Sequence, residues 1–235
     1  MILKECTKRL LGTAVVILLA TSSFAQITSG KVVYERKTNL QKLFKDNPRV
    51  KNFINEDTKY RIEDFVLYLS DEPSQGMMKY LTTHNKVYQN WNQGEKIVIM
   101  DMWGQETFVK DSIAKRQWKI TESKRKLGGY MCRKAVWEMN DTTRLYAWFS
   151  PELVPSVGPE GFTGLPGTIL GFATEDGSII YFAKEVEAVK PPEGVLTVDT
   201  KGKDVYTKTE LKATLLEKMG KWVKEKDLDA MFAWI

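Results

Sequence analysis

The chain has 235 residues, of which 43% are hydrophobic and 28% charged, so its composition is that of a globular protein and excludes collagen, coiled coil and wholesale disorder. Its 35 Lys and Arg against 30 Asp and Glu give a formal charge of +5, an excess too small to indicate a nucleic-acid-binding protein. The single histidine excludes sites that need two or more imidazoles, such as the zinc site of an HExxH protease.

Residues 1–25 have the pattern of a signal peptide. Three basic residues precede a short apolar run, and Ser23 and Ala25 are the small residues that a signal peptidase reads. We expect cleavage after Ala25, which leaves a single domain of residues 26–235. The apolar run is about half of the roughly 20 residues that a spanning helix needs, and no later run is as long. We therefore expect no transmembrane segment after cleavage, and no lipid anchor, because Cys6 lies far from the cleavage point.

Most of the remaining chain predicts antiparallel strands. Residues 30–38 alternate as a half-buried strand does, and residues 39–56 predict two short helical turns around Pro48. Over residues 59–69 the apolar positions change phase, which predicts one bent strand with a bulge near Asp64. Further strands are predicted at 78–83, 96–102, 107–110, 117–122, 130–138, 144–149, 168–174 and 178–187, with a hairpin turn at Asp176-Gly177.

The C-terminal segment predicts a helix. Thr207 to Glu210 fit a capping box, and apolar residues follow at helical spacing: Leu211, Leu215, Leu216, Met219, Trp222 and Val223. We expect this amphipathic helix to pack on the sheet rather than lie on a membrane surface. A run of strands followed by one helix predicts a mainly β (α+β) fold, a curved antiparallel sheet or open barrel with a C-terminal helix.

The segment from Pro151 to Gly167 holds four of the eight prolines and four of the sixteen glycines of the chain in 17 residues. Proline fixes its own φ and restricts the residue before it, so this segment predicts a stiff loop rather than a floppy one. Pro166-Gly167 predicts a type II turn that leads into the next strand. The candidate binding residues of the loop are Pro151, Gly158, Pro159, Gly164, Leu165, Pro166 and Gly167.

Residues 164–169, Gly-Leu-Pro-Gly-Thr-Ile, resemble the signature that names the GLPGLI family of exported bacterial proteins. Segments 129–135 and 144–152 and the pair Gly158-Pro159 are similar to that family too, so the resemblance runs from about residue 30 to residue 187. Thr168 stands where the family name has leucine, while the turn residues are unchanged. The resemblance implies a cell-envelope protein of unknown function, in the periplasm or on the periplasmic face of the outer membrane. It carries over no catalytic residue.

Cys132 is the only cysteine left after cleavage, so no intramolecular disulfide can form. A lone cysteine in a strand is most often a small buried hydrophobe. The alternative is a functional thiol, since Arg133 and Lys134 would favour the thiolate of an exposed side chain. Thioether and thiolate ligands together suit Cu(I), although methionine more often fills gaps in a core. The candidate copper ligands are Cys132, Met131, Met100 and Met102.

Between Lys115 and Lys134 there are eight basic residues and one acid, a pattern typical of a solvated hairpin that would also attract anionic partners such as lipid head groups. The seven tryptophans would either build the core or line a pocket in the curved sheet. Trp91 lies in a polar stretch, where an exposed ring would mark a contact, and Trp148 is the second aromatic candidate.

No catalytic spacing is recognisable, so we lean against an enzyme. The sequence favours a non-enzymatic binding module whose stiff loop and aromatic-rich sheet contact a hydrophobic ligand, a peptide or an outer-membrane partner. The first alternative is a thiol or copper-binding protein that uses Cys132, with copper the one cofactor considered. The second is a hydrolase whose carboxylates carry no signature. Nucleic acid is not an expected partner, because the protein is predicted to be exported.

Overall fold

A computed structural model describes residues 26–45, 47–70, 75–79, 85–102, 104–140, 143–221 and 225–232. Within these residues twelve strands are hydrogen-bonded side by side in the order β12-β6-β5-β4-β3-β2-β1-β11-β10-β9-β8-β7. All neighbours are antiparallel except β12 and β6, so the predicted mainly β fold is confirmed. The strands are β1 (Gly30–Asn39), β2 (Tyr60–Leu69), β3 (Gln75–Lys79), β4 (Lys86–Asn90), β5 (Glu95–Met102), β6 (Gln105–Ser112), β7 (Lys119–Leu127), β8 (Tyr130–Asn140), β9 (Thr143–Ser150), β10 (Thr168–Thr174), β11 (Ile179–Glu187) and β12 (Val205–Thr207).

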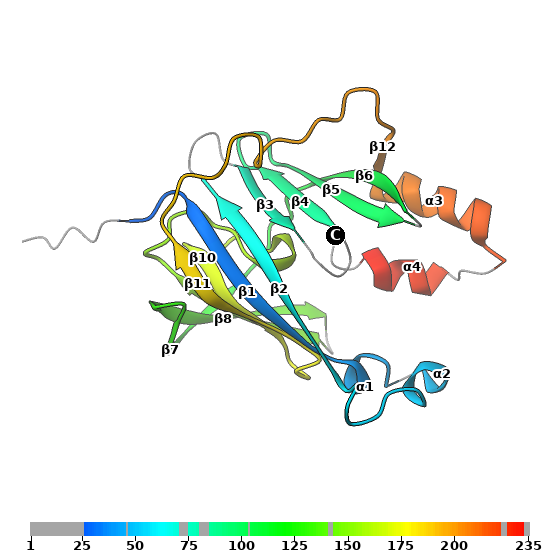
Figure 1. The fold of residues 1–235 in the computed structure, drawn as a ribbon, viewed down its shortest axis with the longest axis horizontal. Coiled ribbons are helices and arrows are strands. Elements are labelled where there is room, and N and C mark those ends of the chain that lie inside the picture. The colour runs from blue at the N-terminus through cyan, green and yellow to red at the C-terminus, as the bar shows by residue number, and fades with distance from the viewer. Residues whose placement is uncertain are drawn as a thin grey trace, which may run out of the picture.

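The sheet is strongly curved, with β3 to β6 in one half and β1, β2 and β7 to β11 in the other (Figure 1). A short 3-10 turn, η2 (Pro159–Gly161), lies on the inner face between the halves and contacts β3 and β4. The helices are α1 (Leu40–Leu43), α2 (Pro48–Lys51), α3 (Lys208–Met219) and α4 (Glu225–Phe232). Helix α3 packs beside β6 and β12, as Figure 1 shows, and buries Leu211 and Leu215.

Strand β1 shows how the sequence separates the two faces of the sheet. Its side chains alternate between buried and half-buried, and the buried set includes Val32, Tyr34 and Arg36. These residues point to the inner face, where they join Phe65 of β2 and Tyr181 of β11 in the core. The period of two along the strand therefore places one face of the sheet in the core, as the alternation in the sequence predicted.

The predicted bulge near Asp64 is wrong. The register between β1 and β2 runs without a break from Gly30–Leu69 to Asn39–Tyr60. The apolar pattern changes phase because Tyr60 and Ile62 lie beyond the core, where Ile62 is 58% exposed. The register shift of β1 occurs on its other side, against β11, between Val33 and Tyr34.

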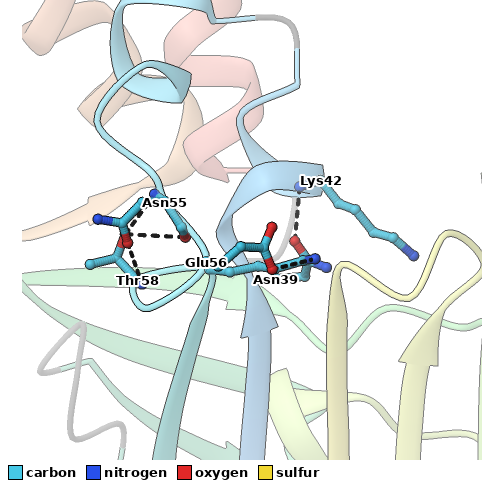
Figure 2. A network of polar contacts seen from close by, with 6 residues as sticks. Asn39, Lys42, Asn55, Glu56 and Thr58 are labelled. Carbon is cyan, nitrogen blue, oxygen red and sulfur yellow. Dashed lines mark hydrogen bonds and ion pairs between the residues drawn. The ribbon is translucent and has the colours of Figure 1, made fainter.

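Two polar networks lie near the end of β1 (Figure 2). The side chain of Asn39 caps α1 by accepting a hydrogen bond from the backbone N–H of Lys42 at 3.1 Å. Asn55 and Thr58 exchange side-chain and backbone hydrogen bonds just before β2. The two helical turns predicted around Pro48 are confirmed, since α1 and α2 lie on either side of residues 44–47.

The predicted capping box of the C-terminal helix is confirmed. The Thr207 hydroxyl accepts from the N–H of Glu210 at 3.2 Å, and the Glu210 carboxylate accepts from the N–H of Thr207 at 2.7 Å. Strands β4 and β12 and helix α4 were not predicted. Residues 80–83 of the strand predicted at 78–83, together with Trp222 and Val223, lie outside the described residues. No helix in the described part of the chain is long and apolar enough to cross a membrane.

Candidate ligand-binding site at the rim of the inner face

The loop from Pro151 to Gly167 forms polar contacts with four residues that lie in the curved sheet or directly beside it. Glu160 accepts a hydrogen bond from the hydroxyl of Tyr181 on β11 and lies 3.8 Å from the guanidinium of Arg36 on β1. The amide of Gln89 on β4 donates to the carbonyl of Gly161 at 2.8 Å. The indole N–H of Trp118, just before β7, donates to the carbonyl of Thr163 at 2.9 Å. The loop therefore bridges both halves of the sheet across its inner face.

The candidate binding residues of this loop divide into a buried and an exposed group. Pro151, Gly164 and Pro166 are exposed, and they are the members of the set that can meet a partner. The other four are buried against the rest of the protein and are not accessible to a partner: Gly158, Pro159, Leu165 and Gly167.

Gly167 shows why the Leu-Pro-Gly turn needs glycine at its end. Its φ of 137° is one that L side chains rarely adopt. A Cβ at this position would lie 2.1 Å from the carbonyl oxygen of Ser150, which is a backbone atom that cannot move freely. The glycine permits this close approach between the loop and the end of β9.

Phe162, next to η2, is the centre of an aromatic cluster that the sequence did not predict. It is 3% exposed, and its ring centroid lies 4.5 Å from that of Phe172, 6.0 Å from Trp137 and 6.3 Å from Trp118. Trp118 and Trp137 are only half-buried. The aromatic core thus reaches the surface at one end of the inner face.

Arg116 covers this aromatic end. Its guanidinium carbon lies 4.4 Å from the ring centroid of Phe162 and 5.3 Å from that of Trp137, which is cation–π geometry. Its Nε and Nη1 atoms are buried and have no hydrogen-bond acceptor among the described residues. The described residues form no ion pair with Arg116. Burial lowers the pKa of its guanidinium. Arginine nevertheless remains protonated in proteins, so a charged group with unpaired N–H donors stands at this point.

Lys96 of β5 is a second buried cation nearby. Gln89 and Asp111 are its cross-strand partners on β4 and β6, so the three side chains share the inner face. Lys96 is 4% exposed, and its Nζ lies 3.9 Å from the Asp111 carboxylate. Burial lowers the pKa of Lys96 to about 8; Asp111 opposes this shift, while the charges of Arg116 and Lys208 add to it.

Three segments converge around these cations. The backbone N–H of Ile113 donates to the carbonyl of Gly94 at 2.9 Å, which joins the connection after β6 to the turn between β4 and β5. The loop reaches the same place through Gly161, bonded to Gln89, and through Phe162, beneath Arg116. We call the resulting set the rim cluster; it consists of Gln89, Trp91, Lys96, Asp111 and Arg116.

Trp91, whose ring would mark a contact if it were exposed, is half-buried and packs against the core. It opens the turn between β4 and β5, whose Gly94 carbonyl accepts a hydrogen bond from the N–H of Ile113. Its indole Nε1 is buried and has no acceptor in the described part of the chain. Trp91 thus adds a third unpaired N–H donor to the rim cluster.

Cys132 is fully buried, and burial raises the pKa of its thiol to about 12. A thiol in this state is protonated at neutral pH and does not act as a nucleophile. Met131, beside it on β8, is 51% exposed, so the two side chains point to opposite faces and cannot bind one ion. Met100 and Met102 lie on β5, and seven strands separate β5 from β8 in the sheet order. The described residues contain no group of three or more His, Cys, Asp and Glu side chains that could hold a metal ion.

Trp148 is half-buried, packs against the core and lies on the opposite face of β9 from Leu145, Ala147 and Phe149. Its ring is 5.2 Å from the guanidinium of Arg125 and 5.7 Å from the ammonium of Lys134. These cations belong to the β7–β8 hairpin, in which the side chains of β7 are mostly exposed, as expected for the basic stretch, while Arg133 and Lys134 of β8 are half-buried. A groove of about 520 Å³ at the start of the hairpin is lined by Lys115, Gln117, Lys119, Val136, Trp137 and Glu138.

No family model and no curated protein sequence matches this chain. Solved structures of PNGF-II are similar in fold. One structure of PNGF-II superposes with a TM-score of 0.55 at 15% identity over 83% of this chain, and a second with a TM-score of 0.52 at 14% identity over 77%. An uncharacterised conserved protein from Thermus thermophilus gives a TM-score of 0.43 at 10% identity over 77% of this chain and 91% of that one.

The chain spans 34% and 31% of the two PNGF-II chains that it matches. At this identity the likeness concerns the fold alone, since one fold hosts many unrelated functions.

Proposed function

We propose that this protein is an exported, non-enzymatic binding module of the cell envelope, related to the GLPGLI family, that receives a ligand with an apolar part at the rim of its inner face. The leader-like residues 1–25 and the Gly-Leu-Pro-Gly turn at 164–167 support the location and the family. The periplasm or the periplasmic face of the outer membrane is the proposed site of action.

The observation that carries the binding role is the half-buried pair of rings Trp118 and Trp137 beside Arg116. Ligand sites are commonly lined by aromatic side chains with a few placed polar groups. A small ligand, or the apolar part of a peptide, would cover these rings and displace water from them. The buried thiol of Cys132 weighs against the alternative of thiol chemistry, because its raised pKa leaves almost no thiolate at neutral pH.

Binding of the uncharged fluorescent probe N-phenyl-1-naphthylamine tests this proposal. We expect the protein to enhance the fluorescence of the probe in a saturable manner, and Trp137→Ala to weaken binding about tenfold or more, since one buried aromatic contact supports that much affinity. Trp148→Ala is the matched control, because that ring lies on the opposite face of β9 from Leu145, the cross-strand partner of Trp137. Equal losses in the two variants, or no saturable binding, would overturn the proposed site.

A native mass spectrum of the protein, purified gently from the envelope of its own host, tests the same role without a chosen probe. A non-covalent mass of lipid or peptide size, lost on denaturation, is the expected result. A bound mass that matches copper would instead support the thiol and methionine alternative.

A further inference from the structure

The rim cluster contains three buried N–H donors for which the described residues offer no acceptor: Nε and Nη1 of Arg116 and Nε1 of Trp91. Buried polar groups in native proteins almost always have a hydrogen-bond partner. These donors belong to two side chains, one in the turn between β4 and β5 and one in the connection after β6, and the Ile113–Gly94 bond joins these two segments. They are a chemical requirement that the described chain leaves unmet. All three atoms call for an acceptor, and none of them can act as one.

The stacking of Arg116 does not satisfy this requirement. A guanidinium is planar, and its N–H bonds point outward in its own plane. The rings of Phe162 and Trp137 lie 4.4 and 5.3 Å from its central carbon and contact it through cation–π attraction. Such contacts hold the group in place but supply no acceptor oxygen. Arg116 is thus fixed in position while two of its buried donor atoms, Nε and Nη1, lack an acceptor among the described residues.

The charge balance at the rim cluster points to an anion. Lys96 and Arg116 supply two positive charges, and Asp111 supplies one negative charge at 3.9 Å from the Lys96 ammonium, which is longer than a good charge-assisted hydrogen bond. The other nearby carboxylate, Glu160, already accepts from Tyr181 and faces Arg36. Lys208 adds a further positive charge close enough to affect Lys96.

We propose that the rim cluster binds an anionic group, a carboxylate or a phosphate, with the Arg116 guanidinium as its main partner and the Lys96 ammonium and the Trp91 indole N–H beside it. This inference rests on the proposed binding role, since it names the polar part of the ligand whose apolar part covers Trp118 and Trp137. Arginine suits both anions, because its N–H groups match the geometry of carboxylate and phosphate oxygens.

Anion titrations of the ¹⁵N-labelled protein, followed by NMR, test the inference with inorganic phosphate and acetate as probes. We expect the indole N–H signal of Trp91 and the Nε–H signal of Arg116 to move in a saturable manner with one or both anions, because each gains an acceptor. Sodium chloride at equal ionic strength should not produce these shifts. A response to acetate alone identifies a carboxylate ligand, and a response to phosphate alone identifies a phosphate ligand.

Arg116→Gln should weaken the anion response of Trp91 about tenfold or more, as the loss of a charged donor predicts. Arg125→Gln is the matched control, since Arg125 also lies against a tryptophan ring, that of Trp148, which is not part of the rim cluster. Trp91→Phe keeps an aromatic ring at this position and removes the indole N–H, so it tests the site even if Arg116→Gln fails to fold. In that variant the anion should bind severalfold more weakly when followed by the Arg116 signal.

The absence of a saturable shift, an equal shift with chloride, or an equal loss in Arg125→Gln would overturn the inference. Its failure is distinguishable from failure of the binding role. Saturable binding of the uncharged naphthylamine probe without any anion response would leave the apolar site standing and reject the anion site.

Discussion

Replacing Lys96 with Met tests whether a charged ammonium is buried at the rim cluster. The fold lowers the pKa of Lys96 from 10.5 to about 8, and its side chain is almost fully buried. Because a tenfold change in proton affinity corresponds to about 1.4 kcal/mol, burying the charged form costs about 3 kcal/mol relative to the neutral form. Methionine has a similar shape and no charge, so at pH 7 we expect Lys96→Met to be more stable than the wild type by about this amount.

The stability difference between Lys96→Met and the wild type should shrink as the pH rises. The unfolded chain holds the Lys96 proton up to about pH 10.5, whereas the folded protein releases it near pH 8. Raising the pH from 8 to 10.5 therefore increases the free energy of unfolding of the wild type relative to that of Lys96→Met. By pH 10.5 the advantage of the variant should fall by about 3 kcal/mol.

Urea unfolding, followed by tryptophan fluorescence at several pH values between 7 and 10.5, measures this difference. Tyrosines and Cys132 also titrate in alkali, but they do so in both proteins and cancel in the comparison. The buffers must lack phosphate and carboxylate, since an anion at the rim cluster would stabilise the wild type. A stability difference that stays constant with pH would refute the reasoning, because it would mean that the folded state does not desolvate the ammonium.

Three further substitutions or reagents test other parts of the structure. Gly167→Ala should lower the free energy of unfolding by more than about 2 kcal/mol, because the new Cβ would strike the Ser150 carbonyl. Gly194 also has a positive φ, but no atom lies near the position of its Cβ, so Gly194→Ala should lower the free energy of unfolding by only about 1 kcal/mol in the same urea assay. Tyr34→Phe should cost about 1–3 kcal/mol, since it leaves the buried Ile169 carbonyl without its 2.6 Å partner. Cys132 should react with Ellman's reagent at pH 8 only when urea unfolds the protein, and fast labelling of the native state would contradict its burial.

The sequence predicts an element well where one face of that element enters the core. Strand β10 has the predicted bounds, and the Thr207–Glu210 box caps α3 as its spacing requires. Strand β4 was missed because its inner face carries the polar Gln89 beside Val87, so it lacks the apolar alternation of a half-buried strand. Gln89 is satisfied by a loop carbonyl 72 residues away, a partner that no local pattern identifies.

The candidate site was predictable only in part. The aromatic content and the stiff loop were visible in the sequence, but the basic stretch between Lys115 and Lys134 gave no sign that Arg116 differs from its neighbours. Arg116 lies against Phe162 of the loop, and Trp118, two residues on, donates to the Thr163 carbonyl of the same loop, while Lys115 and Lys119 stay exposed. That distinction depends on the path of a loop 45 residues further along the chain, so it requires tertiary structure.

The stiff loop and the rim cluster are mechanically linked. Phe162, the ring beneath Arg116, is held between the Gln89–Gly161 bond on one side and the Trp118–Thr163 bond on the other. The Leu-Pro-Gly turn that follows closes against Ser150, which fixes where the loop rejoins β10. A change in that turn would therefore move Phe162 and alter Arg116 without any contact between the turn and a ligand. The conformational restriction of the prolines thus has a role in the proposed site: it holds the aromatic surface on which an otherwise mobile guanidinium is positioned.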